Sequence, residues 1–174
     1  MPTKLSGLPA TEQIGRTLDH LLGRRVILKP AKPWELSVPQ NILWGVYTDD
    51  AESQQVLWGC DLALAANISA SLCIFPPSRV QECIMACKLD EVLEADFREV
   101  MNVLSQVLNS PGRAHYRLQE VRMQSGKAAV EITQGLAAKP NRMDLEATVT
   151  GYGGGRMIIF ELSKTDRGAA QVKV

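Results

Sequence analysis

The stretch from residue 90 to residue 109 constrains the fold of this 174-residue chain more than any other, because its apolar side chains recur at helical spacing. At about 100° per residue, these side chains fall within one arc of roughly 120°. They are Leu93, Phe97, Val100, Met101, Leu104, Val107 and Leu108. A helix with such a face buries it against another layer of structure. We therefore predict a helix over 90–109 that begins at the N-cap Asp90 and packs on a sheet.

Segments with the alternation or the β-branched, apolar composition of strands lie on both sides of this helix. A helix is predicted at 11–22 and a shorter one at 78–88. The predicted strands are 25–29, 42–48, 55–65, 70–75, 114–123, 128–133, 143–149 and 156–162. This grouping predicts a single α+β domain over 1–174, with long helices packed on a mainly antiparallel β-sheet. We expect an ordered core over about 11–162 and a flexible tail at 163–174.

Charge and composition exclude several classes of protein. Nineteen basic residues balance nineteen acidic ones, and a domain that wraps nucleic acid or an anionic membrane needs a basic excess. No apolar run approaches the roughly 20 residues that cross a bilayer, and the start, MPTKLSGLPATEQ, lacks the apolar core of a signal peptide. We therefore expect a cytoplasmic protein with no nucleic-acid partner and no membrane insertion.

The face of the 90–109 helix opposite the apolar arc carries the candidate site. Ala95, Glu99, Asn102 and Gln106 fall within about 60° of one another there. Glu99 and Asn102 are three residues apart, so they are neighbours on the surface, and neither is needed for packing. On most surface helices such a pair consists of solvated residues only, and that interpretation stays open.

A Glu-x-x-Asn motif on an exposed amphipathic helix, Glu99-Val100-Met101-Asn102, with this order of elements, resembles the CheC/CheX chemotaxis phosphatases. The order of elements covers roughly residues 11–162, and the motif covers a handful. That family has an α+β fold with long helices on a β-sheet. One such motif in the chain resembles the single-motif CheX type more than the two-motif CheC type.

The resemblance implies a substrate, a phosphorylated response-regulator receiver domain that itself holds the Mg²⁺, so that the chain needs no cofactor of its own. Asn102 would orient the attacking water and Glu99 would dock on a regulator lysine, while Ala95 and Gln106 would contact the partner. Phosphoryl transfer depends on positioning and charge neutralisation more than on covalent help. A flat helix face suits a substrate that is itself a protein.

The chain departs from the family pattern at three places. Ala95 stands where the family prefers an acid or serine, Gln106 replaces a frequent glycine, and Ser125-Gly126 lies where a later proline is expected. Asp96 is one residue away from the acidic position and is rotated off that face. A second hypothesis is therefore an inactive CheC/CheX-like scaffold module in signalling or motility, forming a homodimer through an exposed sheet edge. A third is an unrelated α+β domain.

The cysteines and the glycine run have plainer interpretations than a metal or phosphate site. Cys83 and Cys87 have a spacing that can hold a metal, but with Cys60 and Cys73 they are expected to be buried free thiols. The run Gly151–Gly155 precedes a strand, which predicts a hairpin turn and no phosphate loop. No metal site is predicted.

Two aromatic and basic features complete the sequence-based expectations. Trp44 and Trp58 are predicted in the core, while Trp34, in a proline-bounded loop, is a candidate partner contact. His115 is expected to point to solvent.

Overall fold

A six-stranded antiparallel sheet with the order β1-β5-β6-β3-β2-β4 forms the middle of the molecule. The computed structural model describes residues 7–126 and 129–163. Within these residues the strands are β1 (Val26–Pro30), β2 (Gln40–Asp49), β3 (Gln54–Asp61), β4 (Tyr116–Gly126), β5 (Arg142–Val149) and β6 (Gly153–Ser163). The helices there are α1 (Thr11–Leu22), α2 (Leu62–Leu72), α3 (Pro77–Ala86), α4 (Glu91–Leu108) and α5 (Val130–Ala137). The predicted α+β class is confirmed.

The strand order has an internal twofold relation. Exchanging β1 with β4, β2 with β5 and β3 with β6 reproduces the same order read backwards. The same exchange relates α1, which precedes β1, to α4, which precedes β4. The two central strands, β3 and β6, pair with each other, and β1 and β4 are the two edges. The fold is therefore built from two similar halves, each of which places one long helix ahead of three strands.

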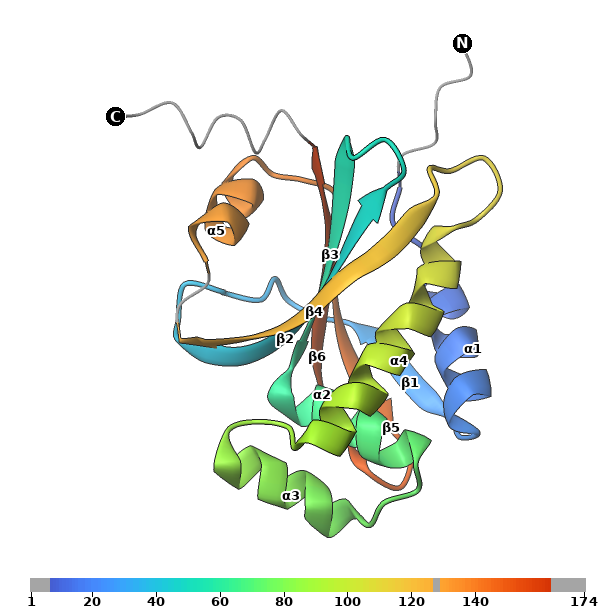
Figure 1. The fold of residues 1–174 in the computed structure, drawn as a ribbon, viewed down its shortest axis with the longest axis vertical. Helices are drawn as coiled ribbons and strands as arrows, with labels where there is room; N and C mark the ends of the chain where they lie inside the picture. Colours follow the sequence, from blue (N-terminus) through green and yellow to red (C-terminus); the bar gives the residue numbers. More distant parts are fainter. Residues whose placement is uncertain (1–6, 127–128, 164–174) are drawn as a thin grey trace.

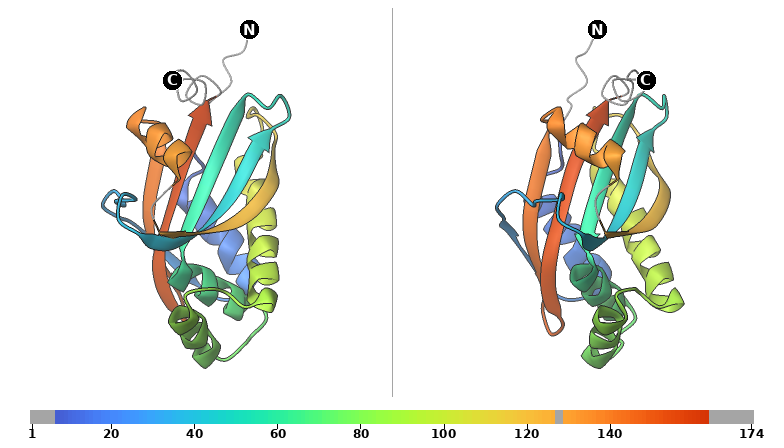
Figure 2. Two further views of the ribbon diagram at one scale, coloured as in Figure 1. Left: turned by 60° about the vertical axis from the view of Figure 1, so that its left-hand side comes forward. Right: turned by 90° about the vertical axis from the view of Figure 1, so that its left-hand side faces the viewer.

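Helices α1, α2 and α4 cover one face of the sheet, whereas α5 lies on the other face (Figure 1, Figure 2). The main core lies between the three helices and the sheet, and it includes the fully buried Tyr47, Trp58 and Phe97. A second core, around Trp44 and Phe160, lies beneath α5. Helix α3 packs on α2 at one end of the molecule. Both Trp44 and Trp58 are 0 % exposed, as predicted.

Both ends of α4 are held by side chains. The Asp90 carboxylate is the N-cap and accepts from the amides of Val92 and Leu93, both at 3.0 Å. It also pairs with the Arg79 guanidinium at 2.9 Å. At the other end, the Asn109 side chain accepts from the amide of Tyr116 at 2.6 Å and donates to its carbonyl at 2.9 Å. These contacts fix the rotation of α4 relative to the sheet edge β4.

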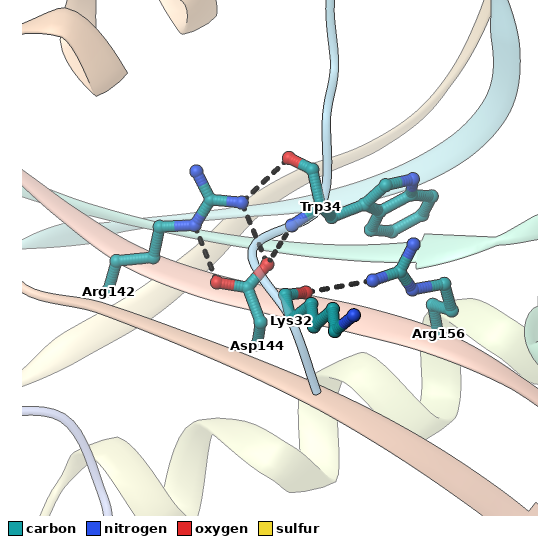
Figure 3. A network of polar contacts seen from close by, with 5 residues as sticks. All are labelled: Lys32, Trp34, Arg142, Asp144 and Arg156. Carbon is teal, nitrogen blue, oxygen red and sulfur yellow. Dashed lines mark hydrogen bonds and ion pairs between the residues drawn. The ribbon is translucent and has the colours of Figure 1, made fainter. Parts of the chain in front are cut away.

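The proline-rich segment 31–39 crosses the second face of the sheet and is fastened there by a polar network (Figure 3). The Asp144 carboxylate accepts from the Trp34 amide at 2.7 Å and pairs with Arg142 at 2.6 Å. Arg142 in turn donates to the Trp34 carbonyl at 2.7 Å, and Arg156 donates to the Lys32 carbonyl at 2.8 Å. Trp34 is 6 % exposed, so its proposed role as a partner contact is wrong: the indole belongs to the second core.

The strand predicted at 70–75 is wrong, because residues 62–72 form α2 and β3 already ends at Asp61. The Asp61 carboxylate caps α2 by accepting from the Leu64 amide at 2.8 Å. Helix α2 is buried nearly all round, so its sequence lacks the amphipathic period that marks a surface helix. Gly155 allows its close approach, since a Cβ there would overlap Asp61 and the Leu64 backbone.

The strand predicted at 128–133 is also wrong. Residues 130–137 form α5, which buries Ile132 and Gly135 against the second core. Two buried positions three residues apart are too few to show a helical period. The hairpin predicted at Gly151–Gly155 is confirmed, with Gly151 at φ +86° in the turn between β5 and β6. Of the tail predicted at 163–174, Ser163 is the last residue of β6, and residues 164–174 lie outside the described residues.

The prediction of four buried thiols is half right. Cys60 and Cys83 are buried, whereas Cys73 and Cys87 are exposed. Cys87 adopts the left-handed conformation at the end of α3, with φ +55°, which turns its side chain off the buried side of that helix. His115 is exposed, as predicted, and lies 3.3 Å from Asp50.

Candidate functional site

Helix α4 presents the Glu99-x-x-Asn102 pair to solvent. The seven side chains of the predicted apolar arc are all buried, and Ala95, Glu99, Asn102 and Gln106 are all exposed. The orientation that the helical period predicts is therefore the one in the structure. It follows that any partner reaching this side of the molecule meets a carboxylate and an amide side by side.

Neither polar group of the pair is engaged by the part of the chain that the structure describes. Within residues 7–126 and 129–163, the side chains of Glu99 and Asn102 make no hydrogen bond or ion pair. Three partly buried acids behave differently: Asp90, Asp144 and Asp61 each hold a backbone amide. A carboxylate that carries out no structural task and an amide with both functions open are available for contacts with another molecule.

The backbone beneath the pair is fixed from the sheet side. The Tyr47 hydroxyl, on β2, donates to the Met101 carbonyl at 2.6 Å, and both residues are fully buried. Met101 reaches β2 because Gly45 has no side chain; a Cβ there would lie 3.0 Å from the Met101 methyl. On the solvent side, the Ser105 hydroxyl donates to the Asn102 carbonyl at 2.6 Å. The segment that carries the pair is thus held on both sides.

Burial raises the pKa of Tyr47 well above its ordinary value, and the nearby Cys60 adds to the rise. The phenol therefore remains a neutral donor through the whole physiological range, and its bond to α4 does not depend on pH there. This contact is absent from the sequence-based expectations, because no local pattern pairs a strand tyrosine with a helix carbonyl distant in sequence.

Asp96 does not take the acidic position that Ala95 leaves empty. It is half-buried, and its hydrogen bond to the Cys73 thiol raises the pKa of that thiol. Its side chain therefore points to the end of α2 and away from Glu99 and Asn102, as predicted. The exposed face of α4 has only a methyl group at this point.

A surface groove of about 500 Å³ runs between α1 and α4, next to the pair. The two helices are antiparallel, because Gln13 near the start of α1 donates to the Ser110 hydroxyl beyond the end of α4 at 3.3 Å. The lining, here called the α1–α4 groove, consists of Arg16, Thr17, His20, Leu21, Val103 and Gln106. Of the predicted site residues, the structure places Gln106 in this groove.

Sequence reasoning missed Arg16 and His20 as neighbours of the site. Both lie on the polar side of α1, four residues apart, so they share one face of that helix. The spacing was visible in the sequence, but nothing local indicates that this face borders α4. Only the packing of α1 beside α4 brings the two polar faces together.

The described residues contain neither a candidate metal cluster nor a candidate membrane span. No group of three or more His, Cys, Asp or Glu side chains there could hold a metal ion. Nor does any described helix combine the length and apolar character needed to cross a bilayer. The arrangement on α4 can instead position a water molecule and bind a cation on a partner.

Neither the family models nor the curated proteins include a match to this sequence. Several solved structures, in contrast, are similar to this chain. FliY of Thermotoga maritima superimposes with a TM-score of 0.57 at 14% identity, over 91% of this chain and 87% of that one. Chemotaxis protein CheX of Vibrio vulnificus gives 0.53 at 13% identity, over 86% and 94%.

The FliM middle domain of H. pylori is similar to the same degree, with a TM-score of 0.52 at 11% identity over 91% of this chain and 87% of that one. These likenesses confirm the predicted fold: the chain has the CheC/CheX-like α+β architecture, which FliM and FliY share. At such low identity they establish the architecture and leave the chemistry to the site itself.

Proposed function

We propose that this chain binds the phosphorylated receiver domain of a response regulator and accelerates hydrolysis of its aspartyl phosphate. One observation carries the proposal: Glu99 and Asn102 project together from a rigid helix and have no partner within the described residues. The CheC/CheX-like fold supports it, because one similar structure is a chemotaxis protein, CheX. We place the chain in chemotaxis or motility on this basis.

In the proposed reaction, the Asn102 amide holds a water in line with the phosphorus atom of the acyl phosphate. The water attacks phosphorus and the bond from phosphorus to the aspartate oxygen breaks, giving inorganic phosphate and the free aspartate carboxylate. The receiver supplies the Mg²⁺ that neutralises charge on the phosphoryl oxygens. Glu99 forms an ion pair with a receiver lysine, which fixes the angle of approach. Such positioning is the main contribution that a protein makes to this chemistry.

The test is the decay of aspartyl phosphate on a purified receiver domain with and without the protein. Asn102→Ala is expected to reduce the acceleration about 100-fold, the scale of losing one positioning group, with an unchanged circular dichroism spectrum. Glu94→Ala, at another exposed position of α4, is the matched control and is expected to keep full activity. Equal rates for wild type and Asn102→Ala would contradict the proposed role of the amide.

A binding module without catalysis is the second candidate, and two observations favour it. Ala95 offers no acid or hydroxyl beside Glu99, and FliY and the FliM middle domain have the same fold. In this case the phosphorylated receiver co-purifies with the protein and its phosphate decays at the uncatalysed rate. Such a module is expected to form a homodimer through an exposed sheet edge, β1 or β4. Light scattering, which measures the molar mass in solution, tests this.

A further inference from the structure

The internal twofold relation assigns each residue of α1 a counterpart on α4. Both helices bury apolar residues at i, i+4 and i+8 and end on a buried leucine, Leu22 in α1 and Leu108 in α4. Aligning these leucines superimposes the buried series Ile14, Leu18 and Leu22 on Val100, Leu104 and Leu108. In this alignment Arg16 takes the place of Asn102, and Gln13 takes the place of Glu99.

Helices α1 and α4 lie side by side (Figure 1). The α1–α4 groove joins them: Arg16 and His20 border it on one side and Gln106 on the other. Gln106 is four residues after Asn102, one helical turn along the same face. Arg16 therefore stands across the groove from the turn that follows the Glu99–Asn102 pair.

The guanidinium of Arg16 has no partner in the described part of the chain, which is true of few arginines there. Among the described residues, only Arg16, Arg25 and Arg98 have a guanidinium that makes neither a hydrogen bond nor an ion pair. The remaining described arginines each hold a carbonyl or a carboxylate. A free guanidinium on the wall of a groove is a ready partner for an anion, since its planar fork matches carboxylate and phosphate geometry.

We propose that the α1–α4 groove is the second half of the receiver-binding face. Arg16 there binds the acidic rim of the receiver, that is, the carboxylates around its phosphorylated aspartate. The inference rests on the proposed function and deepens it. A phosphorylated aspartate with bound Mg²⁺ is surrounded by carboxylates, because that ion is held by carboxylates and phosphate oxygens. Glu99 then meets a cation of the receiver and Arg16 meets its anions, so the two contacts together define one orientation.

Because Arg16 serves docking and Asn102 positions the attacking water, the proposal predicts which kinetic constant each variant changes. Arg16 contacts the rim and does not touch the reacting atoms, so Arg16→Gln is expected to raise KM about tenfold, the effect of losing one charge-assisted hydrogen bond. The kcat is expected to stay within about twofold of wild type. Arg16→Glu reverses the charge and raises KM further, while Arg16→Lys keeps the charge, loses the fork and gives an intermediate KM.

The experiment measures kcat and KM for a phosphorylated receiver domain, and Kd for the same domain carrying beryllofluoride, at two salt concentrations. Arg25→Gln is the matched control, because Arg25 is exposed, equally free and outside the groove. It is expected to leave KM unchanged. Wild-type KM rises with salt, and the slope is shallower in Arg16→Gln. Thermal unfolding of each variant checks that the fold is intact.

Three outcomes overturn the inference, and they differ from one another. If the wild type is active but Arg16→Gln and Arg16→Glu keep its KM and Kd, Arg16 has no docking role while the proposed function stands. If the wild type neither binds the receiver nor accelerates loss of its phosphate, the proposed function fails and the inference fails with it. A fall in kcat at unchanged KM also contradicts a docking role.

Discussion

Tyr47 is the residue that ties the sheet to the part of α4 where Glu99 and Asn102 stand. Its hydroxyl and the Met101 carbonyl lie 2.6 Å apart in a fully buried setting. Glu99 and Asn102 flank Met101 in sequence, so a displacement of that carbonyl moves both. Catalytic arrangements are sensitive to shifts of about 1 Å, which makes this contact relevant to the proposed function although Tyr47 never reaches the surface.

Tyr47→Phe removes the donor and keeps the ring. We expect the free energy of unfolding to fall by about 1 kcal/mol, the usual net value of a hydrogen bond, and amide exchange near 101–105 to accelerate. The matched control is Tyr116→Phe, because the Tyr116 hydroxyl donates to Gln54 at 2.9 Å, away from α4. Exchange rates in α4 that respond equally to both variants would argue against a specific anchor.

At the scale of the element, α4 owes its beginning to Asp90, which caps the helix and binds Arg79. These contacts change the pKa of Asp90. The hydrogen bond from Arg79, together with the Leu93 and Val92 amides, lowers the pKa of Asp90 against the opposing effect of burial. Since the folded pKa lies below the unfolded value of about 3.9, the ionised carboxylate stabilises the fold above that pH. The contribution is lost as the pH falls through the folded pKa.

Variants of Asp90 separate the cap from the ion pair. Asp90→Ala loses both and is expected to lower the free energy of unfolding by about 1 kcal/mol at pH 7 from the cap alone. Asp90→Asn keeps a capping oxygen and is expected to lose less. Urea denaturation at pH 7 and in acid measures both. The difference between wild type and Asp90→Asn must shrink as the pH drops below 4; a constant difference would show that the charge is not involved.

At the scale of the whole molecule, the two faces of the sheet are covered in different ways. Three helices cover one face, and the other is closed by α5 and by segment 31–39, which has no regular structure of its own (Figure 2). The Arg142–Asp144 pair holds that segment through both the amide and the carbonyl of Trp34 (Figure 3). The Arg142–Asp144 pair, at the border of the second core, therefore helps to close that core.

Asp144→Ala removes the carboxylate that binds both Arg142 and the Trp34 amide, and leaves the Arg142 guanidinium with the Trp34 carbonyl alone. Because the Asp144 side chain is only 8% exposed, we expect a loss of about 3 kcal/mol in the free energy of unfolding. Faster exchange of the Trp34 amide and a red shift of tryptophan emission should accompany it. Glu146→Ala, two residues along the same strand and exposed, is the control and should change stability by less than about 0.5 kcal/mol. Similar losses of stability in both variants would contradict a specific role of the Arg142–Asp144 pair in holding Trp34.

Local sequence patterns are sufficient to predict the two amphipathic helices, the faces that they bury, and the strands whose apolar residues alternate. Glu99 and Asn102 could be placed on the surface because helical periodicity separates a buried arc from an exposed one within a single element. The cap at Asp90 and the turn at Gly151 are equally local. Each of these features depends on residues a few positions apart, and that is the range over which a sequence pattern carries structural information.

Which elements meet depends on long-range packing, which no local pattern reveals. Helix α2 has no amphipathic period because it is buried nearly all round, and what makes room for it is Gly155, far away in the chain on β6. Arg16 reaches the site only because α1 packs antiparallel beside α4. Long-range contacts of this kind follow from strand order and side-chain volume summed over the whole sheet, and no local pattern encodes them.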